Sequence, residues 1–505
     1  MPKKPKYGSL WDEAAPQASF SEVKKNLSTE VCVIGAGITG LSVGYKLALA
    51  GKKVVIVDKG KVGWGETGVT TAHLSTMLDD RYFQLEKLHG LTNIQMALES
   101  QMMAVNVVEG IVQKEKISCN FKRVNGYLFF DKENEKVLDH EVACLEKMKY
   151  KNFAKLIKGP KGADLGLCLQ FQEQGEFHPL KYLMSLAKIF EKKGGKIYEN
   201  SFASEIKETS EGVTVHLEGG HTIKAESVVV ATNVPFNDKY AFHMKQAAFR
   251  TYVIAVKIGK GEVESSLLYD TEHPYHYVRL YDADPKQNYL IVGGEDHKTG
   301  QPVKDREPYE KLLEWTKEKF PFVKGGIEFE WSGQVIEPID GLAFIGLNPG
   351  NKKVYLATGY SGSGMTYSII AGEILSDLIL GKKHPWAKIY DPQRRNIKAA
   401  AKFIEDGVDV TIQYMEVFTP KEHEEALKKL PKNAGMIIKD GSKKIAAYKD
   451  PQGKVCKFSA VCPHLGCLVH WNRQEKSWDC PCHGSRFDKA GKVLNGPANR
   501  PLDPA

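Results

Sequence analysis

The chain has 505 residues, of which 42% are hydrophobic and 26% charged, the composition of an ordinary globular protein of about three domains. The net charge of +8 is spread over the sequence without a basic block, so nucleic acid is not an expected partner. No apolar run reaches the ~18 residues of a membrane-spanning helix, and the N-terminal extension 1–28 lacks the apolar core of a secretory signal. We therefore expect a cytoplasmic protein without a transmembrane segment.

The first predicted unit is a strand, a glycine-rich turn, a helix and a second strand. The strands are expected at Glu30–Ile34 and Lys53–Val57, and the helix over about Thr39–Ala50. The turn reads G-x-G-x-x-G, whose glycines allow a tight turn, close approach of a pyrophosphate and close helix packing. Asp58, at the end of the second strand, can accept hydrogen bonds from a ribose. The residues expected to contact a nucleotide here are Gly35, Ala36, Gly37, Ile38, Thr39, Gly40, Asp58 and Lys59.

A second loop of small residues, Gly63–Leu74, follows this acid. It resembles the loop that wraps the flavin in FAD-dependent amine and amino-acid oxidoreductases, the group of D-amino-acid oxidase, glycine oxidase and sarcosine oxidase. Three later segments, Phe177–Glu199, Val228–Asn233 and Val354–Thr366, are similar to that family in the same order. The resemblance implies FAD as cofactor and further contacts at Thr70, Thr71, Ala72, His73, Ala203, Ala231, Thr232, Gly362, Ser363, Gly364, Met365 and Thr366.

The resemblance covers about residues 29–395 and also implies the fold. We expect an α/β Rossmann-type FAD-binding domain interleaved with an α+β substrate domain built on an antiparallel sheet. The FAD part would comprise about 29–85, 171–235 and 331–395, and the substrate part about 86–170 and 236–330. Alternating apolar residues predict substrate-domain strands at Gly126–Phe130, Thr251–Val256 and Tyr289–Gly293.

Polar residues gather at Tyr275–Arg279 and Gly293–Lys298 in the expected substrate domain. In the amine-oxidising relatives such groups bind a substrate carboxylate or tune the flavin, so Arg279 and His297 are candidate catalytic residues. Structural ion pairs at strand ends remain an equal alternative for both. Because no second dinucleotide fingerprint is present, electrons are expected from an organic substrate, an amine or amino acid, rather than from NADH.

Cysteines are distributed unevenly. Cys32, Cys119, Cys144 and Cys168 fit the pattern of small buried apolar residues. Five others crowd near the C-terminus, which in an intracellular chain indicates metal binding. A Lys/Glu-rich stretch, 396–432, predicts a helical linker to this last unit. The unit, 433–505, has about 70 residues and needs a stabilising group beyond its own core.

Cys462, His464, Cys480 and His483 form C-x-H and C-x-x-H pairs separated by 15 residues. This set could hold a 2Fe–2S cluster, with two thiolates on one iron and two imidazoles on the other, or a single zinc ion. The stretch resembles the Rieske proteins of respiratory complexes, in which the residues matching Cys467 and Cys482 form a disulfide. The resemblance favours a small all-β Rieske domain over a zinc site.

Two residues near the predicted cluster depart from the pattern or lie outside it. Phe487 stands where the high-potential Rieske proteins have a tyrosine that hydrogen-bonds a cysteine sulfur, while the other donor, Ser485, is kept. The loss of one donor predicts a lower reduction potential. Cys456 matches no ligand position and is expected in a core.

The leading hypothesis is a dehydrogenase in which FAD oxidises an amine or amino-acid-like substrate. Electrons would then pass through the Rieske cluster to an unidentified acceptor. One alternative is a Rieske oxygenase component, which needs a 2-His-1-carboxylate iron site. The only similar run, Glu422–Glu425, has one histidine and lies in the predicted linker. A second alternative is a binding or maturation protein in which the cluster is structural.

Overall fold

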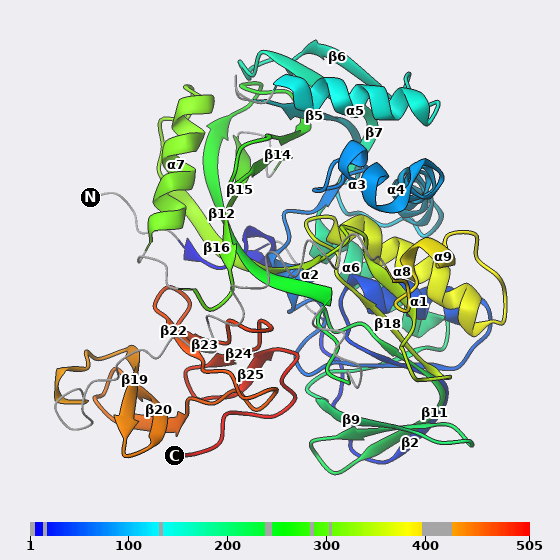
Figure 1. Cartoon of the computed structure of the whole chain (residues 1–505). Coiled ribbons are helices and arrows are strands. Elements are labelled where there is room, and N and C mark those ends of the chain that lie inside the picture. The colour runs from blue at the N-terminus through cyan, green and yellow to red at the C-terminus, as the bar shows by residue number, and fades with distance from the viewer. Residues whose placement is uncertain are drawn as a thin grey trace.

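The computed structural model describes residues 6–13, 18–130, 135–237, 245–282, 287–301, 306–395 and 427–505. Most of the predicted linker 396–432, with the run Glu422–Glu425, lies outside the described residues. Figure 1 shows three parts: a sheet with helices that contains the N-terminal glycine motif, a larger sheet, and a small group of C-terminal strands. Within the described residues, no helix has both the length and the apolar character needed to cross a membrane.

The first part is an eight-stranded, mostly parallel sheet in the order β17-β18-β11-β2-β3-β8, extended by β9 and β10. Its central strands read as Val- and Ile-rich runs, and all four residues of β3 are buried, as expected for a parallel sheet covered on both faces. The strands are β2 (Leu27–Ile34), β3 (Val54–Val57), β8 (Lys196–Tyr198), β9 (Ala203–Glu208), β10 (Val213–Leu217), β11 (Thr222–Val230), β17 (Phe344–Leu347) and β18 (Val354–Thr358).

Three helices pack together beside this sheet: α1 (Ile38–Leu49), α6 (Pro179–Lys192) and α8 (Gly364–Ile379) (Figure 1). Small residues let α1 and α8 cross closely, because a Cβ added to Gly372 would lie 2.9 Å from the Cβ of Ser42. On the other face, apolar residues of β9 and β10 pack against β2 and β3. These contacts hold the starts of α1 and α8 next to each other.

The second part is a ten-stranded sheet in the order β1-β16-β12-β15-β14-β13-β5-β7-β4, with β6 paired to β7. Its pairs are antiparallel except β1–β16 and β13–β5. The strands are β1 (Lys6–Tyr7), β4 (His73–Leu74), β5 (Lys122–Phe129), β6 (Ala154–Lys158), β7 (Leu167–Glu176), β12 (Gln246–Gly259), β13 (Ser266–Tyr269), β14 (His276–Asp282), β15 (Gln287–Lys298) and β16 (Ile327–Pro338).

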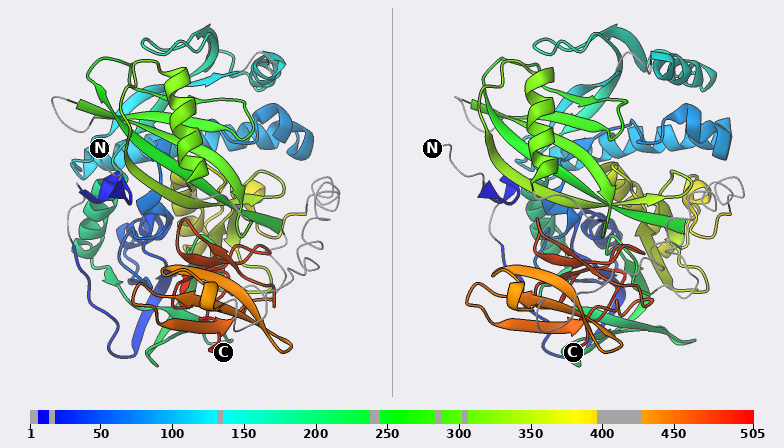
Figure 2. Two further views of the ribbon diagram at one scale, coloured as in Figure 1. Left: turned by 90° about the vertical axis from the view of Figure 1, so that its left-hand side faces the viewer. Right: turned by 60° about the vertical axis from the view of Figure 1, so that its left-hand side comes forward.

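Helix α7 (Glu307–Lys319) lies across this sheet and packs on β12 and β15 (Figure 2). Its buried side chains, Tyr309, Leu312 and Trp315, join an apolar core with inward-facing residues of those strands. The remaining helices are η1 (Leu10–Glu13), α2 (Glu66–Val69), α3 (Tyr82–His89), α4 (Leu91–Lys114), α5 (Glu135–Lys147) and α9 (Ala387–Tyr390).

The third part is all-β and contains two small sheets, β19-β20-β21 and β22-β23-β24-β25. The strands are β19 (Ala434–Asp440), β20 (Lys443–Lys449), β21 (Val455–Ser459), β22 (His470–Asn472), β23 (Ser477–Asp479), β24 (Arg486–Asp488) and β25 (Val493–Asn495). The predicted fold class is therefore confirmed: an α/β unit interleaved with an antiparallel-sheet unit, followed by a small all-β unit.

The four scattered cysteines, Cys32, Cys119, Cys144 and Cys168, are buried as predicted. The prediction for Cys456 was wrong, because this side chain is only partly buried. The reason is its place in β21, an edge strand of a three-stranded sheet. All five residues of β21 are only partly buried.

Candidate functional site

The glycine-rich turn between β2 and α1 is packed so tightly that side chains are excluded. Gly35 has a φ of +110°, and an added Cβ there would overlap Ala231 O. A Cβ on Gly40 would overlap Gly35 O. At the helix start, Gly37 provides no side-chain cap, so the positive end of α1 is open to an anion. This geometry fits the pyrophosphate of a dinucleotide.

The acid at the end of β3 supports the same turn. Asp58 accepts the Ala36 amide at 2.7 Å and the Gly60 amide at 2.8 Å. Burial raises the pKa of Asp58, and the two amides oppose that shift. Its neighbour Lys59 donates to Leu494 O in the C-terminal part of the chain. The nucleotide-binding turn is thus linked directly to the all-β unit.

A second helix start meets the first. Helix α8 begins at Gly364, and its N-cap residue Ser363 makes no side-chain capping bond. Ser368 in the first turn of α8 hydrogen-bonds Thr39 of α1, with 2.8 Å between the two hydroxyl oxygens. The predicted contact residues Met365 and Thr366 lie buried in the same turn. Two positive helix ends therefore lie close together, an arrangement that would stabilise the negative charge that a flavin gains on reduction.

The loop Thr70–His73 is held by groups far away in the sequence. Trp11 Nε1 donates to Thr70 O at 2.6 Å. Arg279 Nη1 donates to the carbonyls of Thr71 and Ala72 at 3.1 and 2.9 Å and to Phe177 O at 3.1 Å. Ala72 has a φ of +60°, so this loop conformation is strained and depends on these contacts.

The side chain of Arg279 is 2% exposed, and a carboxylate oxygen of Glu176 lies 3.6 Å from its Nη2. Among the two roles that the sequence left open, its contacts favour the structural one. His297 stacks on Tyr252 with 5.6 Å between ring centroids, and burial lowers its pKa to about 4. Its catalytic role stays a prediction.

The other predicted flavin contacts lie at strand ends of the first sheet. The Ala231 amide donates to Ile34 O at 2.8 Å directly after β11, and Thr232 Oγ1 donates to Val234 O at 2.8 Å. Ala203 is buried at the start of β9. Gly362 lies in the turn before α8 and donates its amide to Asp79, a residue that the sequence analysis did not single out.

Two loops of the all-β unit bring the predicted cluster ligands together. The imidazole centroids of His464 and His483 lie 5.1 Å apart. Cys480, the backbone amides of His464 and Leu465, and the Ser485 hydroxyl all hydrogen-bond the Cys462 sulfur and lower the pKa of this thiol, although burial opposes them. Amide and hydroxyl donors directed at a cysteine sulfur fit a 2Fe–2S cluster, whose charge they stabilise.

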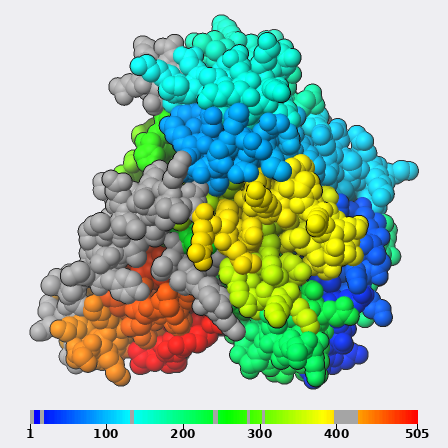
Figure 3. Space-filling model, turned by 45° about the vertical axis from the view of Figure 1, so that its right-hand side comes forward, coloured from blue at the N-terminus to red at the C-terminus, as the bar shows by residue number. Residues whose placement is uncertain are grey.

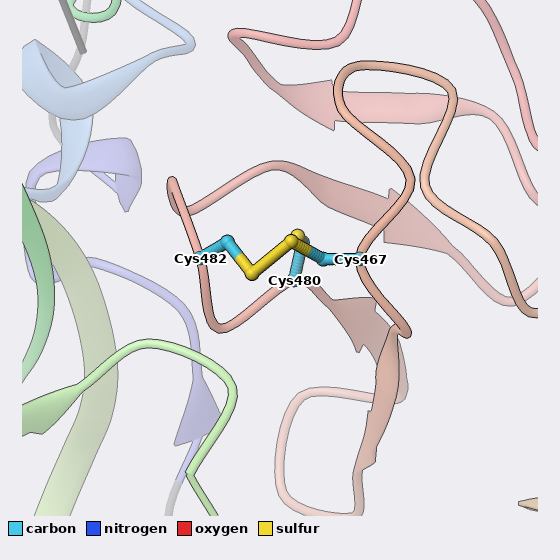
Figure 4. A group of neighbouring side chains, drawn as sticks. All are labelled: Cys467, Cys480 and Cys482. Atoms are coloured by element: carbon cyan, nitrogen blue, oxygen red, sulfur yellow. A yellow bond between two sulfur atoms is a disulfide. The ribbon is translucent and has the colours of Figure 1, made fainter. Parts of the chain in front are cut away.

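Cys467 and Cys482 form a disulfide that joins the two loops, as the Rieske resemblance implied (Figure 4). The sulfur of Cys480 lies within 4.8 Å of both disulfide sulfurs. These three sulfurs do not make a metal site, because sulfurs in a disulfide are not available as thiolates. The predicted ligand set of two cysteines and two histidines remains the one that the geometry supports.

The all-β unit is docked on the rest of the protein through a buried ion pair. Arg250 of β12 donates to both oxygens of Glu475, with a shortest distance of 2.7 Å, and Ser332 of β16 donates to Glu475 at 2.7 Å. The side chains of Arg250 and Glu475 are 2% and 6% exposed. Arg486 binds the same carboxylate from within the all-β unit. The two arginines hold the pKa of Glu475 well below its usual range despite its burial.

The loop with Cys480 and His483 lies within this interface. Gln334 Nε2 donates to Gly484 O at 2.7 Å, and a Cβ added to Gly484 would overlap Ala248 Cβ. A Cβ on Gly300 would lie 2.6 Å from Pro481 N. Beyond β25, Asn499 Nδ2 donates to Ser204 O of β9 at 3.1 Å. Figure 3 shows the all-β unit, in orange and red, at the same end of the molecule as the green strands of the first sheet. Sequence analysis missed this interface, since its partners are far apart along the chain.

Comparison with known proteins agrees with this geometry. Residues 30–378 match the family described as FAD dependent oxidoreductase, which is more than half of the chain. The chain belongs to this FAD dependent oxidoreductase family. Residues 424–504 match the Rieske [2Fe-2S] domain. FAD and a Rieske 2Fe–2S cluster are therefore its cofactors, and the zinc alternative is set aside.

One relative shares both parts of the chain, and another shares only the first. A Bacillus subtilis (strain 168) protein named "Putative Rieske 2Fe-2S iron-sulfur protein YhfW" is 30% identical over 499 residues, covering 98% of this oxidoreductase and 96% of that protein. Gamma-glutamylputrescine oxidoreductase of Escherichia coli (strain K12) is 24% identical over 377 residues, covering 72% of this chain and 86% of its own length.

Solved structures agree in fold. Glycine oxidase from Geobacillus kaustophilus superposes with a TM-score of 0.61 at 17% identity and covers 73% of this oxidoreductase and 100% of its own chain. L-proline dehydrogenase from P. horikoshii gives a TM-score of 0.61 at 19% identity. The superposition covers 73% of this oxidoreductase and 98% of the L-proline dehydrogenase chain. At these identities the likeness supports the fold alone.

The hydrogen bond from Ser485 predicts a measurable effect on the cluster. We expect Ser485→Ala to lower the reduction potential and Phe487→Tyr to raise it, because donors to cluster sulfurs stabilise the reduced, more negative state. Bonds to charged groups contribute about 1.5–3 kcal/mol, so shifts of several tens of millivolts or more are expected, since ~59 mV corresponds to a tenfold change in a one-electron equilibrium. An EPR-monitored redox titration of the full-length protein measures both, with Ser459→Ala as control. Unchanged potentials in both variants would refute a donor role for Ser485.

Proposed function

We propose that the protein dehydrogenates an amine or amino-acid-like substrate and passes the electrons from FAD to the Rieske cluster and on to an acceptor. The observation that carries this proposal is the contact of the cluster loop Cys480–Gly484 with β12 and β16, since Gln334 of β16 also binds Glu66 beside the expected flavin site. A cluster with a purely structural role would have no need of that position. The amine and amino-acid substrates in the names of the similar proteins support the substrate class.

A short chain of contacts joins the two cofactor sites. Thr67 Oγ1 accepts the Ile38 amide at 3.1 Å at the start of α1. Its neighbour Glu66 accepts the Gln334 amide at 2.7 Å and the Asn495 side-chain amide at 3.0 Å. Gln334 in turn binds Gly484 of the cluster loop. These contacts fix the cluster loop relative to the nucleotide-binding turn.

FAD, when bound, accepts two electrons with a hydride from the carbon next to the substrate nitrogen, and the cluster can remove them one at a time. Loss of this hydride and of one proton from the nitrogen converts a neutral amine to an imine, or an alkylammonium cation to an iminium ion. The chain's own residues position the reaction. The starts of α1 and α8 stabilise negative charge in the flavin region. Arg279 and Trp11 fix the carbonyls of the loop Thr70–His73.

Anaerobic titration of the purified protein with a panel of amines and amino acids tests the proposal. We expect a substrate to bleach the flavin and to give the EPR signal of a reduced Rieske cluster in the same titration. Metal analysis should give two irons per chain. A flavin that bleaches while the cluster stays oxidised would contradict the electron path. A third iron per chain would instead favour an oxygenase.

A further inference from the structure

The carboxyl groups of Asp79, Asp296 and Glu337 lie where the ten-stranded sheet meets the turn before α8. Asp79 accepts the amide of Gly362 and lies so close that a Cβ added to Gly362 would be 2.7 Å from its Oδ2. Asp296 of β15 and Glu337 of β16 each interact electrostatically with Asp79, and Asp296 also with Glu337. The three acids therefore share one region with the turn that precedes α8.

A β-bulge directs Asp296 into this region. In the β12–β15 pair, Arg250 faces His297 and Tyr252 faces Gly294, so the single residue Thr251 is opposed by both Glu295 and Asp296. Glu295 has a φ of +55°, and Gly294 a φ of +148° where a Cβ would lie 2.6 Å from Tyr275 O. Bulges of this kind redirect a side chain and are common beside active sites.

The carboxylate of Asp296 is buried and interacts with the Thr251 hydroxyl, and no cation is paired with it among the described residues. Neither of its oxygens is exposed. Burial, followed by the nearby carboxylates, raises the pKa of Glu337 to about 8, and burial raises that of Asp296 to about 7 while the Thr251 hydroxyl opposes the shift. Burial also raises the pKa of Asp79 to about 6. Burial therefore disfavours the ionised carboxylates of Asp296 and Glu337, and a cation bound beside them would favour their ionisation.

The cations around the acids are also bound to other groups, although Arg81 lowers the pKa of Asp79 and His276 lowers that of Asp296. Arg81 donates to the carbonyls of Leu78 and Asp270, both at 3.2 Å. His276 lies 2.7 Å from a carboxylate oxygen of Asp270, and 3.6 Å separates its Nε2 from Glu295. Asp80 and Glu295 add further negative charge.

Two aromatic rings complete the surroundings of the acids. Tyr275 and Tyr277 lie with 5.7 Å between ring centroids, and both interact electrostatically with Asp296 and Asp79. The hydroxyl of Tyr277 is 2.8 Å from Thr251 Oγ1. Carboxylates beside aromatic faces bind alkylammonium groups, because both attract a desolvated cation. The same surroundings repel a substrate carboxylate.

We propose that the substrate is an amine that enters as an alkylammonium cation and carries no carboxylate at the reacting end, with Asp296 and Glu337 as its counter-ions and Tyr275 and Tyr277 against its methylene groups. This assignment rests on the proposed function and narrows its substrate class. The two buried arginines that could bind a substrate carboxylate already have other partners, since Arg279 binds backbone carbonyls and Arg250 binds Glu475.

Ligand binding to the oxidised holoenzyme tests the proposal without turnover. Tetramethylammonium has no nitrogen lone pair and cannot be oxidised as an amine, so it reports binding alone through the flavin absorption spectrum. We expect it to perturb the spectrum and to bind at least ten times more tightly at pH 9 than at pH 6, because Asp296 and Glu337 ionise as the pH rises through their pKa values. Acetate should cause no change. Acetate binding, or a spectrum that tetramethylammonium leaves unchanged, would overturn the assignment.

Variants locate the effect. Asp296→Asn and Glu337→Gln should each weaken tetramethylammonium binding at least tenfold at pH 9 and flatten its pH dependence, with FAD and cluster content unchanged. Asp282→Asn, at the exposed end of β14, is the matched control and should bind as the wild type does. Equal binding by all three variants would refute the roles of the two acids.

The outcomes also separate this inference from the proposed function. If amino acids reduce the flavin and acetate competes with them, the cationic substrate class is wrong and the dehydrogenase proposal stands. If no amine or amino acid reduces the flavin, the dehydrogenase proposal fails, and the binding of tetramethylammonium still decides whether the acids form a cation site.

Discussion

Replacement of Glu475 by Gln is expected to release the all-β Rieske unit from the flavoprotein. The carboxylate of Glu475 neutralises Arg250 on one side of the interface and Arg486 on the other, and all three groups are buried. Removing one member of a buried charge network typically costs about 3–5 kcal/mol, because the remaining charges stay desolvated without a partner. We expect this loss to outweigh the remaining hydrogen bonds across the interface, such as those from Gln334 to Gly484 and from Asn499 to Ser204.

Small-angle X-ray scattering and rapid mixing measure the result. We expect a larger radius of gyration in Glu475→Gln and at least a tenfold slower reduction of the cluster after the flavin is reduced, with the cluster EPR signal intact. Asp503→Asn is the control, since the pair Arg500–Asp503 is exposed and surface pairs contribute about 0–1 kcal/mol. If both variants keep the wild-type dimensions and rate, docking does not depend on Glu475.

Gly40→Ala is expected to abolish flavin retention. The added Cβ would overlap Gly35 O, a backbone atom that cannot move without opening the nucleotide-binding turn. Overpacking at such a point displaces α1 from β2 and typically costs about 1–3 kcal/mol or more, so we expect loss of nearly all FAD on purification. The cluster should remain, because its ligands lie in a separate unit.

Absorbance of the purified variant and its iron content measure these effects. Gly110→Ala is the matched control, because Gly110 is also helical and no atom lies within 4 Å of its added Cβ. Full FAD content in Gly40→Ala would show that the turn tolerates a side chain and would contradict the close-packing argument.

A dinucleotide site and a site for an iron–sulfur cluster or zinc could be predicted from the sequence because their motifs are local, whereas FAD and the Rieske cluster were implied by the two family resemblances. Gly35, Gly37 and Gly40 lie within one turn, and Cys462 and His464 are separated by a single residue. In each case the spacing of residue types is itself the geometry that the cofactor needs. The disulfide between Cys467 and Cys482 required the Rieske resemblance, since spacing alone does not specify a pairing.

Other parts of the site depend on contacts that no local pattern encodes. Arg279 lies in a polar strand segment, and only folding brings it to the carbonyls of Thr71 and Ala72, more than 200 residues earlier. The interface pair Arg250–Glu475 spans 225 residues. Asp296 was part of a recognised polar run, but its orientation depends on a bulge set by the register of β12 and β15. Register is a property of paired strands, so one strand's sequence did not reveal it.

Docking of the cluster loop on its own chain also has a kinetic consequence. In a pair of separate proteins, the encounter of donor and acceptor slows as the solution is diluted. If electrons take the proposed path from FAD to the cluster, this exchange is a unimolecular step, because Gly484 already contacts Gln334. Its rate is independent of how many copies of the protein are present, and only the final handover to the acceptor responds to concentration.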